Sequence, residues 1–190
     1  MYESQDEWVQ KALAHGFTNA VALDATTLIS LDAVRDMCAA GKCGKYDGCW
    51  TCPPACGSID ENKKALKRYS KGILVQVTMA LSDDFDYDTM TLCGQRHKAL
   101  FASFYRLLRA KGLVDILALG AGGCDLCGEC AYPDAPCRQP DNALSSMEAY
   151  GLLVSDVCKQ NGLPYYYGPR TMTFTGCFLF ANEPHVNICD

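Results

Sequence analysis

Cysteine is the residue type that most constrains this chain, because 13 of its 190 residues are cysteines and most of them fall in two short segments. The second segment reads Gly120-Ala-Gly-Gly123, then Cys124-x2-Cys127-x2-Cys130, then Cys137 and Pro140. Three cysteines at every third position cannot all lie on one face of a regular helix or strand, whereas a tight loop can wrap them around one inorganic centre. We therefore expect a metal-binding loop at residues 124–137.

The spacing in this loop favours an iron-sulfur cluster. The bacterial ferredoxin run is Cys-x2-Cys-x2-Cys-x3-Cys-Pro. Here the first three cysteines keep that spacing, but the last gap has six residues and Pro140 follows Cys137 by three. Zinc stays open as the alternative, since four thiolates at short spacing also make a tetrahedral site, although zinc ligands usually come as two separated Cys-x2-Cys pairs.

The first cysteine-rich segment runs from Cys38 to Cys56 and reads Cys-x4-Cys-x5-Cys-x2-Cys-Pro-Pro-x-Cys. Its glycines and the pair Pro53 and Pro54 predict an irregular loop, because Gly supplies positive φ and Pro is excluded from helix interiors and inner strands. A loop with many thiols and few apolar side chains needs another source of stability. Metal binding would provide it.

Composition limits the class of protein. Hydrophobic residues make up 49% and charged residues 21% of the chain, and no apolar run approaches the roughly 18 residues that a membrane span needs. A net charge of -5 argues against nucleic-acid binding, because little would neutralise phosphates. The acidic start lacks a signal pattern, so we expect a cytoplasmic protein, in which cysteines serve metals and not disulfides. We expect one domain over residues 1–190.

Hydrophobic periodicity predicts an α/β fold, with a mixed β-sheet sandwiched by helices and cysteine-rich cluster-binding loops near strand ends. Helices are expected at residues 5–15, 31–37, 58–70, 89–111 and from 141 or 142 to 160. Strands are expected at 20–23, 73–80, 113–119, 163–167 and 171–181, the last two as a hairpin. Cys158 is expected in the core. Cys93 and His97 share the inner stripe of a helix, where packing and metal ligation are both open.

Two stretches resemble a family of cysteine-rich, predicted metal-binding proteins, the domain of unknown function 2284. The first is Cys38-Ala-Ala-Gly-Lys-Cys43-Gly-Lys-Tyr46-Asp-Gly-Cys-Trp50-Thr-Cys52-Pro53-Pro54. The second joins Gly123-Cys124-x2-Cys127-x2-Cys130 to Cys137-Arg138-x-Pro140 and Ser146-Met-Glu148-Ala-Tyr-Gly151. The resemblance implies two sites, the first held by Cys38, Cys43 and Cys52 and the second by Cys124, Cys127, Cys130 and Cys137. Cys49 and Cys56 are additional to that pattern. The resemblance implies metal binding and no particular reaction.

Three functions compete. The first is electron transfer between a redox partner protein and an anaerobic enzyme through one or two 4Fe-4S clusters. The second is an enzyme in which a three-cysteine cluster leaves one iron open as a Lewis acid for a small-molecule substrate, with His97 or Glu148 as acid or base. The third is a zinc-stabilised structural or metal-handling protein. We expect electron transfer and leave open whether the protein is an enzyme.

Overall fold

A computed structural model describes residues 4–41 and 43–181. One five-stranded sheet with the order β1-β2-β5-β3-β4 lies at its centre. All neighbouring strands are antiparallel except β3 and β4, which are parallel. The strands are β1 (Asn19–Asp24), β2 (Tyr69–Ala80), β3 (Ile116–Gly120), β4 (Ser145–Ser146) and β5 (Thr171–Ala181).

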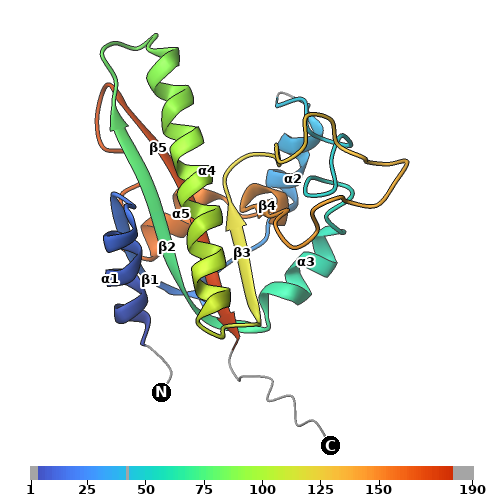
Figure 1. Ribbon diagram of the computed structural model, residues 1–190, viewed down its shortest axis with the longest axis horizontal. Helices are drawn as coiled ribbons and strands as arrows, with labels where there is room; N and C mark the ends of the chain where they lie inside the picture. Colours follow the sequence, from blue (N-terminus) through green and yellow to red (C-terminus); the bar gives the residue numbers. More distant parts are fainter. Residues whose placement is uncertain (1–3, 42, 182–190) are drawn as a thin grey trace, which may run out of the picture.

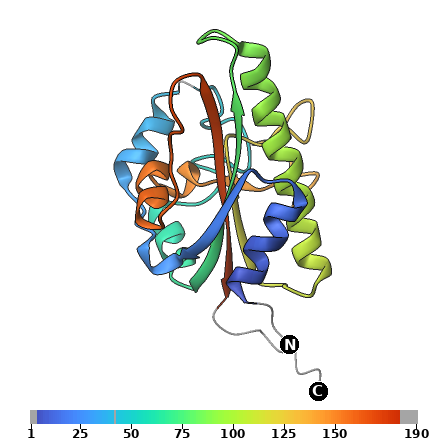
Figure 2. The same ribbon diagram turned by 90° about the vertical axis from the view of Figure 1, so that its left-hand side faces the viewer.

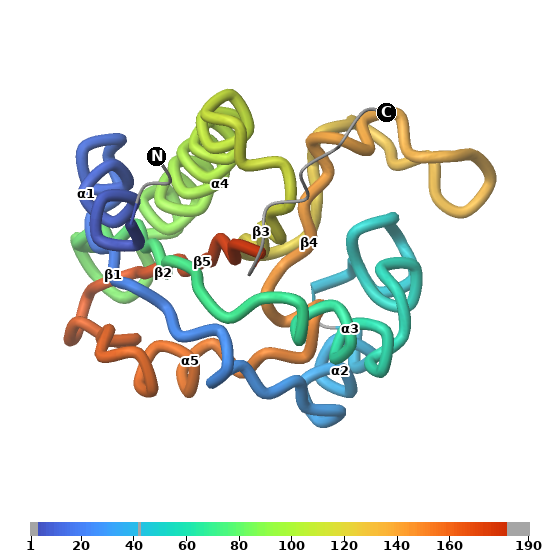
Figure 3. The backbone as a smooth tube through the Cα atoms, turned by 90° about the horizontal axis from the view of Figure 1, so that it is seen from below, coloured from blue at the N-terminus to red at the C-terminus, as the bar shows by residue number. Residues whose placement is uncertain are grey.

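Helices cover both faces of this sheet, which confirms the expected α/β class (Figure 1). Figures 2 and 3 show α1 and α4 on one face and α2, α3 and α5 on the other. The α-helices are α1 (Gln5–His15), α2 (Asp32–Ala39), α3 (Ile59–Leu66), α4 (Tyr87–Ala110) and α5 (Val154–Gln160). Two 3-10 turns, η1 (Ala25–Thr27) and η2 (Glu148–Tyr150), complete the described elements.

Successive side chains along the long strands point to opposite faces of the sheet, so each face has its own apolar core. On β2, Ile73 and Val75 pack with α1 and α4 in one core, whereas Leu74 packs in the other with α5. On β5, Phe178 belongs to the first core and Leu179 to the second. Burial on both faces explains why these strands read as nearly continuous apolar runs.

The helix expected at 58–70 starts as predicted but ends early. Ser58 and Glu61 form a reciprocal capping box at the start of α3. The helix stops at Leu66, and β2 already begins at Tyr69. The Tyr69 side chain is buried and its hydroxyl donates to Asp115 at 3.0 Å. This tertiary contact therefore outweighs the helix propensity of the lysine-rich stretch.

The prediction of a long helix from 141 or 142 to 160 is wrong. Ser145 and Ser146 form β4, residues 148–150 form η2, and α5 begins only at Val154. Gly151 interrupts the segment with a φ of 74°, and a Cβ there would come within 2.6 Å of Ile59 Cδ1. The tight packing of the chain at this point excludes a continuous helix.

The expected strand at 163–167, and with it the hairpin, is also wrong. β5 pairs instead with β2 and β3. The preceding segment is held by a side chain, because Gln76 Nε2 donates to the carbonyl of Pro164 at 3.0 Å and Gln76 Oε1 accepts from the Tyr167 hydroxyl at 2.8 Å. The buried Gln76 thus takes the place of a strand partner.

The two cysteine-rich loops lie side by side beyond the β3–β4 edge of the sheet, as Figures 1 and 3 both show. Within the part of the chain that the structure describes, no helix combines the length and the apolar character needed to cross a membrane.

Candidate metal centre

The second cysteine loop begins where β3 ends, at Gly120, and α4 fixes its first turn. Lys98 Nζ donates to the Gly123 carbonyl at 3.1 Å and forms an ion pair with Asp125 at 2.5 Å. Gly122 has a φ of 72°, which few other residues adopt without strain. The glycine turn therefore leads the chain abruptly out of the sheet and into the cysteine loop.

Five thiols line one cavity between the two loops. The empty space in this cavity, including its open mouth, is about 380 Å³. Four of the thiols come from the second loop and one from the first; they belong to Cys49, Cys124, Cys127, Cys130 and Cys137. The structure thus brings together all four residues predicted for the second site and adds Cys49, which the family pattern did not include.

Aromatic residues hold the two loops against each other. Trp50 Nε1 donates to the Ala135 carbonyl at 3.0 Å, and the Trp50 ring packs edge-on against Tyr132 with centroids 4.9 Å apart. The Tyr132 hydroxyl donates to Asp47 at 2.6 Å. Neither Trp50 nor Tyr132 follows a periodic pattern, so sequence reasoning missed them. Their place among the cysteines was the only available signal.

The loops also approach closely at Gly123. A Cβ at this position would lie 2.9 Å from Lys45 Cγ and 3.4 Å from Cys52 Sγ. Only glycine allows the first loop to pack so tightly over the turn that follows β3. This contact places Cys52 against the second loop.

Hydrogen bonds favour the thiolate form of one cavity residue, Cys49. Burial alone would raise the pKa of the Cys49 thiol, but hydrogen bonds from Thr51, from Cys52 and from the backbone N–H of Cys124 outweigh burial and lower that pKa. Burial and the neighbouring Cys49 raise the pKa of Cys52. Burial also raises the pKa of Cys124. Cys49 is therefore the thiol of this pair that ionises first.

A model of the family described as "Predicted metal-binding protein (DUF2284)" matches residues 21–180. The chain belongs to this family. The comparisons with curated proteins and with solved structures gave no match. The matched region includes both cysteine-rich loops, so the metal-binding description applies to the part of the chain that forms the cavity.

Two cysteines of the first loop of this DUF2284 protein lie against the second loop. Cys52 lies with Cys49 on the side of the second loop. Cys56 follows closely, since its backbone N–H donates to the Cys52 carbonyl at 3.0 Å. Burial and then the charge of Cys43 raise the pKa of the Cys38 thiol, and burial raises the pKa of Cys56.

All twelve described cysteines are free thiols. Among residues 4–41 and 43–181, no three Cys, His, Asp or Glu side chains converge closely enough to hold a single metal ion. The five thiols that line the cavity are therefore not drawn together around one point.

Three other candidate residues of the DUF2284 protein lie in its apolar cores. Cys93 and Cys158 are both fully buried, and Cys158 Sγ lies 3.7 Å from the Gln76 amide that donates to it. Cys93 Sγ lies 3.5 Å from the carbonyl oxygen of Val77, to which its thiol donates. His97 is 1% exposed and stacks on Phe101. Core packing therefore explains Cys93 and Cys158.

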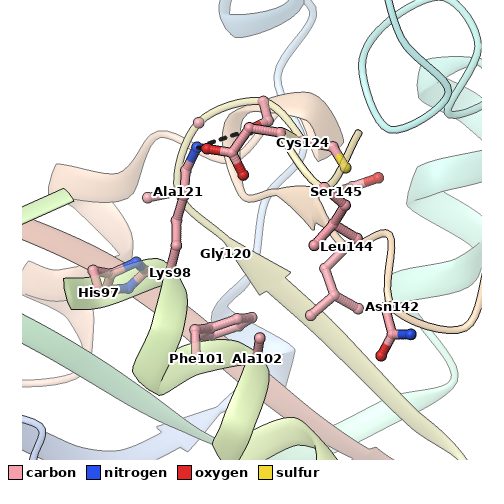
Figure 4. A pocket seen from close by; sticks show the side chains of 14 residues that line it. His97, Lys98, Phe101, Ala102, Gly120, Ala121, Cys124, Asn142, Leu144 and Ser145 are labelled. Atoms are coloured by element: carbon pink, nitrogen blue, oxygen red, sulfur yellow. Dashed lines mark hydrogen bonds and ion pairs between the residues drawn. The ribbon is translucent and has the colours of Figure 1, made fainter. Parts of the chain in front are cut away.

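His97 also borders a second cavity, between α4 and the turn after β3 (Figure 4). Figure 4 shows His97, Phe101 and Ala102 of α4 on one side and Leu144 and Ser145 on the other. Neither ring nitrogen of His97 has a hydrogen-bond partner among residues 4–41 and 43–181, and burial lowers the pKa of its imidazole to about 4. Cys124 and Leu126 line both cavities, so they form the wall between them.

Proposed function

We propose that the cavity between the two loops holds a 4Fe-4S cluster and that the protein transfers electrons through it. Five cysteine thiols around one cavity are the observation that carries this proposal. Cys124, Cys127, Cys130 and Cys137 would be the cluster ligands, and Cys49 would be a fifth, ionisable thiol beside them. When bound, such a cluster exchanges one electron at a time.

The residues around the cavity fit an anionic thiolate-ligated group. Gln139 Nε2 donates to Cys127 Sγ at 3.9 Å and to the Leu126 carbonyl at 3.1 Å, so the same amide holds the loop and polarises a sulfur. Arg138 donates to the Glu129 carbonyl at 2.9 Å and brings a positive charge to the loop. Hydrogen bonds to sulfur and nearby positive charge both stabilise the more reduced form of a cluster.

The cavity lies near the protein surface, which supports exchange of electrons between a cluster in it and another protein. Leu126 lines the cavity and is 40% exposed. The four proposed ligands are each only partly buried. A partner could therefore dock within a short distance of the cluster without any rearrangement of the fold. A redox protein is the partner that this chemistry requires.

A redox titration without oxygen tests this proposal. The visible absorption of the metal-loaded protein should fall on addition of dithionite and return on mild reoxidation, with a one-electron dependence on potential. The reduced form should give an electron paramagnetic resonance signal. A metal-loaded protein whose spectrum does not respond to reduction would rule out electron transfer.

An enzyme is the second candidate, and the cavity beside Cys124 favours it. A small molecule in that cavity would lie against Cys124 and within reach of His97, whose neutral imidazole can donate one hydrogen bond and accept another. The test is to add a small thiol to the reduced protein in a Cys38→Ser background, which removes one ligand of the first site that the resemblance implies. A shift of the remaining resonance signal supports the enzyme, and an unchanged signal supports the electron carrier.

A further inference from the structure

The cavity that His97 borders, between α4 and the turn after β3, has mainly apolar walls. The empty space in this His97 cavity, including its open mouth, is about 450 Å³. The rings of His97 and Phe101 stack on one side, with centroids 5.5 Å apart, and Leu144 lies on the other side (Figure 4). Ala102 and the glycine-rich turn 120–123 form further parts of the lining. Walls of this kind are typical of sites for small organic molecules.

The charges in the lining of the His97 cavity are paired with each other. Lys98 and Asp125 both line the cavity, and they form an ion pair at 2.5 Å. Lys98 Nζ also donates to the Gly123 carbonyl at 3.1 Å. The His97 imidazole is neutral near pH 7, because burial lowers its pKa to about 4. The described lining thus favours an uncharged ligand over an ion.

His97 has an unmet hydrogen-bonding requirement in this cavity. Its side chain is 1% exposed, and neither ring nitrogen has a partner in the part of the chain that the structure describes. A neutral imidazole has one N–H donor and one acceptor nitrogen. A hydroxyl group both donates and accepts, so it can pair with either nitrogen.

We infer that the His97 cavity binds a small uncharged aromatic molecule of the phenol class, whose hydroxyl group pairs with a ring nitrogen of His97. The aromatic ring packs against the apolar walls at Phe101 and Leu144. Cys124 also lines the cavity, so the ligand lies beside a proposed cluster ligand. The inference names the class of small molecule for the second candidate function. It rests on the proposed function in one respect, since a negatively charged cluster at Cys124 would further disfavour an anion.

Isothermal titration calorimetry on the full chain, purified without oxygen, tests this inference with three probes. Phenol has the ring and the hydroxyl group, toluene has nearly the same shape without the hydrogen bond, and benzoate carries a negative charge. Phenol should bind at one site per chain, and benzoate should bind at least about tenfold more weakly. Calorimetry detects binding whatever metal the protein contains, so failure of this inference is distinguishable from failure of the proposed function.

His97→Leu separates the hydrogen bond from the apolar contacts. The affinity for phenol should fall about fivefold, which is the typical effect of one lost hydrogen bond. The affinity for toluene should stay within about twofold of wild type, because the apolar walls remain. Binding of toluene also shows that the cavity of the variant is intact.

Two substitutions on α4 test the location of the site. Ala102 is half-buried and lines the cavity, so the larger side chain of Ala102→Leu should lower the affinity for phenol at least about tenfold. Ala99 lies three residues earlier on the same helix, where it is exposed and outside the lining. Ala99→Leu is therefore the matched control and should keep the wild-type affinity. Thermal unfolding checks that both variants are folded.

Three results would overturn the inference. One is a wild-type protein without saturable binding of phenol, and another is binding of benzoate as tight as that of phenol. The third is a phenol affinity that His97→Leu lowers no more than the toluene affinity, or that Ala102→Leu leaves unchanged. Phenol binding as expected in a protein that holds zinc and no iron would support this site and contradict the proposed function.

Discussion

At the scale of single residues, surroundings divide the cysteines into two groups. Cys158 and Cys177 are fully buried in the apolar core, where burial raises the pKa of each thiol and keeps it protonated. Cys127 is half-buried at the wall of an open cavity. Thiolates bind metals and buried neutral thiols pack, so the two groups should respond differently to the same substitution.

Cys127→Ser should lose about one cluster's worth of iron, roughly four atoms per chain, because a hydroxyl is a poor replacement for a thiolate ligand. Cys158→Ser should lose none, since the serine hydroxyl can accept the Gln76 hydrogen bond in the same place. Iron analysis of both proteins after anaerobic preparation checks this. Equal losses would contradict the division of cysteines into ligands and core residues.

His97 predicts a pH dependence of stability. Its pKa is lowered from 6.5 to about 4 in the folded protein, so below pH 6.5 the unfolded chain binds a proton that the folded chain does not. The free energy of unfolding should therefore fall by about 3 kcal/mol as the pH drops from 6.5 to 4. This contribution levels off above about pH 7.5, where the unfolded-state imidazole is also neutral.

Urea unfolding of the metal-free wild type and His97→Leu, at pH 7 and pH 5, measures this contribution. Wild type should lose about 2 kcal/mol more than the variant over this interval. If the free energy of unfolding fell equally in both proteins, burial would not be what keeps the His97 imidazole neutral in the folded state.

At the scale of elements, local signals predicted those helices and strands whose ends are determined by neighbouring residues. The helix at 5–15 was correct because Ser4 and Glu7 cap its start and Gly16 ends it at a φ of 116°. The single helix predicted for residues 141–160 was wrong, because the apolar spacing of Met147 and Val154 also suits β4, η2 and α5 packed on the sheet. Only tertiary packing distinguishes these alternatives.

Gly151 allows a prediction about this segment. Gly151→Ala should lower the free energy of unfolding by more than about 2 kcal/mol, since its φ of 74° is strained for alanine and the new Cβ would meet Ile59 and Ser30. Gly162→Ala is the control, because Gly162 has a φ of 71° but no atom within 4 Å of the added Cβ. It should cost only about 1–2 kcal/mol. Equal destabilisation in urea would show that packing at Gly151 has no effect.

At the scale of the whole molecule, the sheet holds one loop directly and the loops hold each other. The spacing of the cysteines predicted which thiols of the second loop share a cavity. It did not predict that Cys49 joins them, because this depends on how two segments far apart in sequence pack together. Trp50 and Tyr132 each provide a polar contact between the loops.

Trp50→Phe should weaken that packing. The ring can still pack on Tyr132, but the hydrogen bond to Ala135 is lost, at a cost of about 1 kcal/mol. Iron release to a chelator should become roughly fivefold faster. Trp8→Phe, on the buried face of α1, is the matched control and should release iron at the wild-type rate. Equal rates in all three proteins would mean that loop packing does not control access to the metal.

The central claim is that the thiols between the loops hold an iron-sulfur cluster. The most direct test is to purify the full chain without oxygen and to count iron, acid-labile sulfide and zinc per chain. We expect a brown protein with equal amounts of iron and sulfide, at least about four of each per chain, and no stoichiometric zinc. A colourless protein that contains zinc and neither iron nor sulfide would contradict it.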